Sequence, residues 1–369
     1  MDFDGLRQEA ATQPVVVSLP SLAEFHLDEL TIYSSVKAFE RDLYNPNHRF
    51  ENDVIIDSDE DVVDYPRVTV DQSPFSADLN TVVDWGDRKD FNRVKDQLLC
   101  QSSISDRIVR RNSTADVVVL VIIDGLSFES IRERESDLRG DSTIEPAFVD
   151  GVSITPRGFR RVIYGGKFQS INARLNMKSF TDHIGFTYWS KGQENLSTDL
   201  YRSMHENKVH RVREFDQVRS TIRDHGLDSK TYIQITRMGL DQESHNRKER
   251  PAIDHIVGEI ITDVNQMYEV LDHLSDHFRI YLTSDHGILW RDDVRENIQL
   301  IDEDHSHPRY IEGTTKTSKG ITERVSSEIQ RTALAYPYMT RDFQHTEWGV
   351  HGGLSYQESF VPFIEITSS

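Results

Sequence analysis

Cysteine is nearly absent from this sequence, which contains only Cys100. A single cysteine excludes a disulfide within the chain and a zinc site built from several thiolates, so we expect a buried, unreactive thiol. Long apolar runs are also missing, and no stretch approaches the roughly 20 apolar residues that a membrane-spanning helix needs. The first four residues, Met-Asp-Phe-Asp, lack the basic and apolar segments of a signal peptide. We therefore expect a cytoplasmic protein with no membrane partner.

Positive charge is scarce, with 42 basic against 62 acidic residues and a net charge of −20. Such a surface would normally repel nucleic acids and anionic membranes. However, the basic residues are mostly arginines and the acidic residues occur in runs such as residues 57–61, which resembles the composition of proteins from salt-loving archaea. At molar salt the Debye length is only about 3 Å, so local charge says more about partners than net charge does.

The length of 369 residues and the hydrophobic content of 37% allow one large domain or two smaller ones. Residues 1–112 carry no recognisable catalytic motif, and apolar spacing predicts a helix over residues 23–43. We interpret this part as an N-terminal extension that packs on the core, caps it or binds a partner. Residues 113–369 are the predicted catalytic domain.

The catalytic domain alternates between predicted strands and helices. Val117–Ile123 is a continuous β-branched run, as expected of a central strand buried on both faces, and residues 232–236 and 279–283 are similar. Residues 251–277 carry apolar side chains at helical spacing, and residues 360–366 read as a closing strand. A strand, a helix and a second strand form a crossover unit, so we predict an α/β/α sandwich with a central, mostly parallel sheet.

Four short segments, far apart in the chain, carry side chains that bind metals, and several follow predicted strands. In an α/β protein, functional groups lie just past the carboxyl ends of the strands. Carboxylate oxygens and imidazole nitrogens suit divalent zinc or manganese, and two ions about 4 Å apart can hold the attacking and leaving oxygens of an in-line displacement. We therefore predict a two-metal phosphoryl-transfer site from Asp124, Asp241, His245, Asp285, His286 and His351.

Two of these segments leave an alternative or a condition open. Asp124 could instead be the N-cap of a helix that begins near Ser127, a role that aspartate fills often. Asp241 and His245 stand four residues apart, so they share one face only if their segment is helical.

A hydroxyl that could accept a phosphoryl group lies at a predicted helix start. Pro156 suits the first helical position, which makes Thr155 the candidate N-cap. A nearby metal would lower the pKa of the Thr155 hydroxyl, and the helix N-terminus would favour a bound anion. A threonine before a proline is also an ordinary helix start.

Basic side chains follow this threonine at Arg157, Arg160, Arg161 and Lys167. Arginine suits bidentate contacts with phosphate, so this patch beside the candidate nucleophile indicates substrate binding. The alternative is a solvated basic face. The segment with His305 and His307 has a spacing that could also bind metal, but we expect an exposed acidic loop there. If His351 lay far from the site, one of these two histidines would replace it.

The order of these segments resembles that of the alkaline phosphatase superfamily over residues 115–369. Its phosphodiesterase branch has an Asp-x-x-x-His spacing, matched by Asp241 and His245, and a nucleophilic threonine ten residues before a glycine, matched by Thr155 and Gly165.

A narrower resemblance is to the PglZ-type proteins of the Pgl and BREX phage-defence systems. Their first motif, Asp-x-Leu-x-aromatic-Glu, is matched by Asp124, Leu126, Phe128 and Glu129. The ending over residues 351–362 is also similar to theirs, whereas many PglZ proteins are longer and carry additional domains.

This resemblance implies a fold, two metal sets and a mechanism. Asp241, His245 and His351 would bind one divalent ion, and Asp124, Asp285 and His286 the other, with Thr155 bridging. Zinc is the expected metal and manganese the alternative. Thr155 would form a phosphothreonine that water then hydrolyses.

The resemblance also implies the substrate contacts. Gly158 occupies the place of an asparagine that steadies an equatorial oxygen in related phosphodiesterases, so Arg157, Gly158, Arg160 and Arg161 are the expected substrate-binding residues. The expected substrate is a phosphodiester, either DNA or a nucleotide, and other defence proteins are expected partners. Hydrolysis of a phosphomonoester or a mutase reaction on a small metabolite, and a non-catalytic scaffold in a defence complex, are the alternatives.

Overall fold

The computed structural model describes residues 30–33, 53–56 and 99–368, apart from residues 113, 168, 189–207, 246, 294–297, 302–306, 314–319 and 325–329. These residues belong to two compact units, and all those from Leu99 onward belong to the second. Within the first unit, β1 (Leu30–Tyr33) pairs in parallel with β2 (Asp53–Ile56). The helix predicted over residues 23–43 is therefore wrong at β1, because the β-branched and aromatic residues of Leu-Thr-Ile-Tyr favour a strand. The remainder of that range lies outside the described residues.

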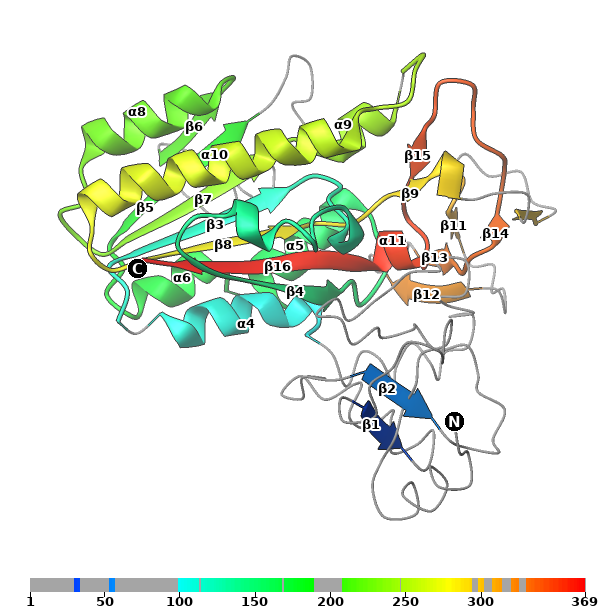
Figure 1. Cartoon of the computed structure of the whole chain (residues 1–369), viewed down its shortest axis with the longest axis horizontal. Helices are drawn as coiled ribbons and strands as arrows, with labels where there is room; N and C mark the ends of the chain where they lie inside the picture. The colour runs from blue at the N-terminus through cyan, green and yellow to red at the C-terminus, as the bar shows by residue number, and fades with distance from the viewer. Residues whose placement is uncertain are drawn as a thin grey trace. The chain divides into compact units, whose positions relative to one another are not determined.

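A seven-stranded sheet forms the centre of the second unit (Figure 1). Its strands lie in the order β4 (Asp141–Phe148), β16 (Phe360–Thr367), β8 (Phe278–Ser284), β3 (Val117–Ile123), β7 (Thr231–Arg237), β5 (Asp182–Tyr188) and β6 (Val209–Val212). The strands β8, β3, β7, β5 and β6 run parallel, and only β16 runs antiparallel to its two neighbours. The predicted mostly parallel sheet is confirmed, and so are the four predicted strands.

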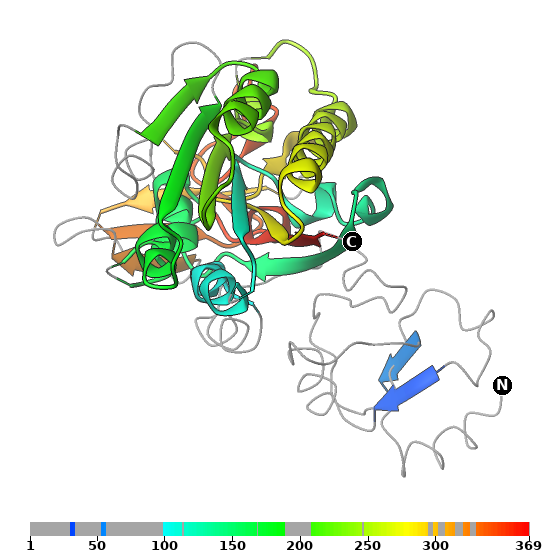
Figure 2. The ribbon, with the colours of Figure 1, turned by 90° about the vertical axis from the view of Figure 1, so that its left-hand side faces the viewer.

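Helices cover both faces of this sheet (Figure 2). On one face, α8 (Phe215–His225) and α10 (Ile253–Leu274) pack over Val117, Val119, Val121 and Ile123. On the other, α4 (Gln101–Arg111), α5 (Thr155–Tyr164) and α6 (Ile171–Asn176) pack over the alternate residues of β3. All seven residues of β3 are buried, and at about 1.5–3 kcal/mol for each aliphatic side chain this strand alone contributes on the order of 10 kcal/mol of burial free energy. The domain is an α/β/α sandwich.

The register of the central strands fixes where the functional segments meet. The crossover through α10 joins β7 to β8, and these two strands flank β3. Ile123, the last residue of β3, lies opposite Arg237 of β7 and Ser284 of β8. The carboxyl ends of all three strands therefore lie side by side at the same end of the sheet.

Small elements complete the second unit between β8 and β16. A three-stranded sheet has the order β11 (Tyr310–Glu312), β13 (Gln330–Leu334) and β12 (Gly320–Arg324). Two further pairs are β9 (Leu289–Trp290) with β15 (Gly349–Val350), and β10 (Gln299–Leu300) with β14 (Tyr338–Met339). Among its described residues, the short helical elements are η2 (Phe128–Ser130), η3 (Glu135–Asp137), α9 (Leu240–Ser244), η5 (Arg291–Asp293) and α11 (Tyr356–Ser359).

Two observations bear on the limits of the domain. Helix α4 belongs to the second unit, so this unit begins before the boundary that we placed at residue 112. Cys100, just before α4, is 4% exposed, as expected of a buried thiol. In the described part of the chain, none of the helices combines the length and apolar character needed to cross a membrane.

Candidate metal centre

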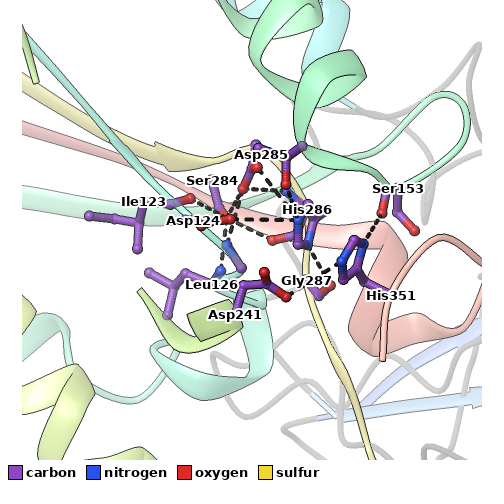
Figure 3. A network of polar contacts seen from close by, with 12 residues as sticks. Ile123, Asp124, Leu126, Ser153, Asp241, Ser284, Asp285, His286, Gly287 and His351 are labelled. Carbon is purple, nitrogen blue, oxygen red and sulfur yellow. Dashed lines mark hydrogen bonds and ion pairs between the residues drawn. The ribbon is translucent and has the colours of Figure 1, made fainter. Parts of the chain in front are cut away.

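The candidate ligands converge at the carboxyl ends of the central strands β3, β7 and β8 (Figure 3). Asp124 directly follows β3, Asp285 and His286 follow β8, and Asp241 lies in α9 just after β7. His351 follows β15 and comes from the small elements between β8 and β16. Segments separated by more than 200 residues thus supply one cluster.

The first group consists of Asp124, Asp285 and His286, whose ligand atoms all lie within 4.8 Å of one another. Nε2 of His286 is 3.7 Å from Oδ1 of Asp124 and 3.5 Å from Oδ2 of Asp285. All three residues are buried. Asp124 does not cap the short helix η2, whose N-cap is Ser127, so the alternative role for Asp124 is excluded.

The second group consists of Asp241, His286 and His351, again within 4.8 Å of one another. Oδ1 of Asp241 lies 3.5 Å from Nε2 of His351 and 3.4 Å from Nε2 of His245. His245 follows the last residue of α9 in an extended conformation and borders this group, in contact with Asp241. The geometry therefore differs from the predicted division of the ligands into two separate metal sets, because His286 belongs to both groups. Its ring stacks on that of His351, with the ring centroids 4.0 Å apart.

Backbone carbonyls set the orientation of the two central histidines. Nδ1 of His286 lies 3.0 Å from the carbonyl oxygen of Gly287, and Nδ1 of His351 lies 3.0 Å from that of Ser153. A carbonyl only accepts, so each Nδ1 carries the proton and donates it. Each Nε2 is then unprotonated and lies 3.5–3.7 Å from carboxylate oxygens, which is the tautomer of a metal-binding histidine.

Three carboxylate oxygens at the centre are buried and have no hydrogen-bond partner among the described residues: Oδ1 of Asp124, Oδ1 of Asp241 and Oδ2 of Asp285. An unpaired buried carboxylate is strongly unfavourable unless a cation or a proton compensates its charge. Oxygen and imidazole donors together suit a divalent metal such as zinc or manganese. The residues present therefore fit the implied metals.

The pKa values report the same crowding of negative charge. Burial raises the pKa of Asp285 to about 8, and repulsion by Asp241 adds to the rise. Burial and repulsion by Asp285 raise the pKa of Asp124 well above its ordinary value. Burial would also raise the pKa of Asp241, but His351 and His245 outweigh it and lower this pKa. Burial lowers the pKa of His286 to about 3, which keeps the ring in its neutral, metal-binding form.

Thr155 reaches this cluster from the start of α5. Its hydroxyl oxygen lies 3.0 Å from Nε2 of His286. The predicted N-cap is displaced by one residue: Ile154 is the N-cap, and Thr155 is the first residue of the helix. The Thr155 side chain is therefore not used in capping, and its hydroxyl points at the cluster.

The arginines next to Thr155 already have an acidic partner. Nε of Arg157 donates to Glu323 at 2.9 Å, and Nη2 of Arg161 donates to the same carboxylate at 2.7 Å. Arg161 is 8% exposed and also donates to the carbonyl oxygen of Val152. Arg161 therefore braces the start of α5, and the substrate contact predicted for it stays a prediction. The positive charge of Arg157 is compensated by Glu323. The side chain of Arg160 is exposed on α5.

Gly158 has a structural role in the close packing of α5, and its predicted contact with substrate stays a prediction. Its amide donates to the carbonyl oxygen of Ile154 within the first turn of the helix. A Cβ atom at this position would lie 2.0 Å from the carbonyl oxygen of Asp285. Glycine is needed here because α5 packs directly on the backbone that carries Asp285 and His286.

Several residues of the site carry no motif that sequence reasoning could detect. Gln101, at the start of α4, donates through Nε2 to the carbonyl oxygens of Ser284 and Asp285 at 2.8 and 2.7 Å. The Ser284 hydroxyl lies 2.7 Å from the carbonyl oxygen of Ile123 and accepts from the amide of Leu126. The Ser153 hydroxyl donates to the carbonyl oxygen of Gly353. Their only signal is position, because each is next to a strand end or the helix start.

The segment around His307 is not the exposed acidic loop that we expected. His307 stacks on Tyr310 with ring centroids 3.9 Å apart, and its ring centroid lies 5.6 Å from that of His351. Burial lowers the pKa of His307 to about 2, and the nearby His351 adds to this effect. Since His351 lies in the site, no replacement ligand is needed. His305 lies outside the described residues.

Comparison with known proteins gives one family and several distant structural likenesses. The family model for the BREX system PglZ alkaline phosphatase-like domain matches residues 104–366. No curated protein matches the sequence significantly.

Among solved structures, the chain is similar to murine ectonucleotide pyrophosphatase/phosphodiesterase 5 in complex with AMP, with 14% identity over 68% of this chain and 87% of that chain and a TM-score of 0.43. Human ectonucleotide pyrophosphatase/phosphodiesterase 5 gives 13% identity over the same shares and a TM-score of 0.40. The C-terminal periplasmic domain of EptC from Escherichia coli gives 11% identity over 70% and 74%, with a TM-score of 0.34. Likenesses this distant carry no information about activity.

Proposed function

Because the chain belongs to the family of BREX system PglZ alkaline phosphatase-like domains, we propose that it hydrolyses phosphodiesters with a threonine nucleophile and two divalent metal ions. Membership in this family places it among the phosphoesterases of the alkaline phosphatase superfamily. The proposal adds three details to this family assignment: the threonine nucleophile, the two metal ions and the diester substrate.

One observation carries the proposal. Carboxylate oxygens of Asp124, Asp241 and Asp285 that lack a hydrogen bond within the described part of the chain converge with histidine nitrogens, and the Thr155 hydroxyl lies 3.0 Å from the histidine shared by both candidate groups. A buried cluster of acids that served only stability would have its oxygens hydrogen-bonded. This arrangement supports a site that is completed by cations and acts on the neighbouring hydroxyl.

We propose that one ion is held by Asp124, Asp285 and His286, with Thr155 beside it, and the other by Asp241 and His351 with His245 or His286. Bound there, the ions supply positive charge that lowers the pKa of the hydroxyl and stabilises the phosphoryl oxygens. The Thr155 oxygen forms a bond to phosphorus while the bond to the leaving group breaks. Water then cleaves the phosphothreonine and restores the hydroxyl.

The proposed substrate class is a diester rather than a monoester. A phosphomonoester carries more negative charge at neutral pH and needs additional cationic contacts. The two buried or half-buried arginines beside Thr155 are compensated by Glu323, which leaves less positive charge for a terminal phosphate. A phosphomonoesterase or mutase acting on a small metabolite is therefore the less favoured alternative.

The proposed biological setting is supported by the family alone. We propose that the protein acts in the cytoplasm in defence against phage, on DNA or a nucleotide, together with other defence proteins. Zinc is the proposed metal, with manganese as the alternative. The role of residues 1–112 in capping the core or binding a partner is a part of this proposal, as is a salt-rich cytoplasm suggested by the acidic composition.

The test compares metal content with turnover in matched variants. Bound zinc and manganese are measured by mass spectrometry, and hydrolysis of bis(p-nitrophenyl) phosphate and p-nitrophenyl phosphate is followed at low and at molar salt. We expect Thr155→Ala to keep its metal and lose diester hydrolysis, and Asp285→Asn to lose both. Thr262→Ala, exposed on α10, is the control. Equal turnover in all four proteins would contradict the mechanism, and bound metal with no turnover in the wild type would favour a scaffold.

A further inference from the structure

We propose that His307 is a substrate-binding residue that hydrogen-bonds an oxygen of the phosphodiester on the Asp241 and His351 side of the site. This inference rests on the proposed function and adds a residue to it.

His307 lies close to the metal centre without being one of its ligands. Its ring is edge-on to His351, with centroids 5.6 Å apart and an interplanar angle of 71°. Among the described residues, the two groups whose ligand atoms converge within 4.8 Å do not include His307. The imidazole therefore lies next to the His351 ring and outside both candidate ligand groups.

The position of His307 is fixed by its neighbours. The Thr340 hydroxyl donates to its carbonyl oxygen at 2.6 Å, and Tyr310 stacks on its ring. Two residues further on, Arg309 is fully buried and donates through Nη2 to Glu358 at 2.8 Å.

The same Glu358 carboxylate ties this segment to the turn after His351. It accepts from the amide of Gly353 at 2.8 Å. The buried pair of Arg309 and Glu358 therefore holds His307 and His351 in one rigid unit, although 44 positions separate them, and such preorganisation is what a binding residue requires.

The His307 ring has hydrogen-bonding capacity that no described residue uses. Its Nδ1 atom is buried and has no partner among the described residues. Two arginines lie near the ring, and each is paired with a glutamate: Arg331 with Glu312 and Arg341 with Glu347. An imidazole N–H is a hydrogen-bond donor that suits an anion held by the neighbouring metal centre. A phosphodiester oxygen is such an acceptor.

The test separates binding from turnover. His307→Phe keeps the aromatic stack on Tyr310 and removes the hydrogen-bonding nitrogens. His307→Ala also removes these nitrogens, but without placing a larger ring at this position. Loss of a hydrogen bond to a charged group corresponds to about tenfold or more in affinity. We expect the Kd of inorganic phosphate for the metal-loaded protein, measured by calorimetry, and the KM for bis(p-nitrophenyl) phosphate to rise by about that factor. The metal content should not change, and His307→Gln should recover part of the loss. His255→Phe, exposed on α10, is the matched control.

The possible outcomes distinguish a failure of the role proposed for His307 from a failure of the proposed phosphodiester hydrolysis. If phosphate affinity and KM in His307→Phe and His307→Ala equal those of the wild type, His307 does not bind substrate, while diester hydrolysis by the wild type would leave the proposed function intact. If these variants lose metal, His307 is a ligand and the inference is wrong. If the wild type binds phosphate but hydrolyses no diester, the proposed hydrolysis fails, and the phosphate affinities alone decide the role of His307.

Discussion

The hydroxyl oxygen of Thr155 lies 3.0 Å from Nε2 of His286, although 131 positions separate the two residues in the chain. One stands at the start of α5 and the other just past the end of β8. Glycine at position 158 permits this approach, because α5 lies against the backbone of Asp285. The candidate nucleophile and the histidine shared by both metal groups are therefore brought together by backbone packing.

The first prediction concerns the pH dependence of stability in the metal-free protein. The pKa of Asp285 rises on folding from 3.8 to about 8, so its contribution is fully present below about pH 4 and is lost as the pH rises toward 8. The pKa of His286 falls from 6.5 to about 3, which lowers stability as the pH falls below 6.5. Between pH 6.5 and 8, the melting temperature in chelator should therefore fall with pH. Asp285→Asn should flatten this slope, and an unchanged slope would contradict the assignment.

The second prediction is that Asp124→Asn has opposite effects with and without metal. In chelator above pH 8, where Asp285 is ionised, the substitution removes a buried carboxyl group whose charge is disfavoured by burial and by Asp285 and Asp241, so the melting temperature should rise by a few degrees. In zinc, it removes a ligand, so the stabilisation by metal should shrink. Melting curves of the wild type and of Asp124→Asn, each with and without zinc, measure these opposite changes in melting temperature. Glu133→Gln, whose side chain is 77% exposed, should leave both curves unchanged. A lower melting temperature of Asp124→Asn in both conditions would show that the carboxylate has an internal partner.

The sequence was sufficient for those parts of the site that follow the central strands. Asp124 and Asp285 were predicted because each ends an apolar run, and the register that pairs Ile123 with Ser284 brings them together. The mostly parallel sheet followed from the same runs. Periodic burial is a strong local signal, so strands and the helix α10 could be recognised without a relative.

Other parts of the site depend on contacts between distant residues that leave no local pattern. Arg157 looked like a phosphate ligand, but its partner Glu323 lies 166 positions away on a short strand. His307 looked like an exposed loop residue because its neighbours in sequence are acidic, yet it packs beside His351. Gln101 supports the turn at Asp285 from a helix that has no functional motif. Such roles follow from tertiary packing, which composition and spacing do not encode.

The third prediction uses two glycines in helices. Alanine normally stabilises a helix relative to glycine by about 0.5–1 kcal/mol. In Gly158→Ala the new Cβ would meet the carbonyl oxygen of Asp285 at 2.0 Å, so overpacking of about 1–3 kcal/mol should win and the protein should lose stability. In Gly258→Ala on α10 the nearest atom is 4.0 Å away, so stability should rise. Chemical denaturation gives both free energies of unfolding, and equal signs would contradict the close approach.

The fourth prediction compares two ion pairs. Arg309 and Glu358 are fully buried, and Glu358 also accepts from the amides of Gly353 and Ser355. Glu358→Gln should lower the free energy of unfolding by about 3–5 kcal/mol, because it leaves the buried Arg309 guanidinium without a counter-charge, although the carbonyl oxygens of Leu334 and Tyr338 still accept from it. Glu312→Gln, which breaks a surface pair with Arg331, should cost at most about 1 kcal/mol. Similar losses in the two variants, measured by denaturation, would contradict the buried geometry.

The fifth prediction tests whether Glu323 sets the preference for diesters. This carboxylate pairs with Arg157 and Arg161 and accepts from the amide of Val152. In Glu323→Gln the two guanidinium groups beside Thr155 lose their counter-charge, so a dianionic phosphate should be held more tightly. We expect the ratio of p-nitrophenyl phosphate to bis(p-nitrophenyl) phosphate turnover to rise by about tenfold, the effect of one charged hydrogen bond. Glu259→Gln, with an exposed side chain on α10, is the control. If the ratio stays at the wild-type value while the fold is intact, the arginines only brace α5, and the preference must arise at the metals themselves.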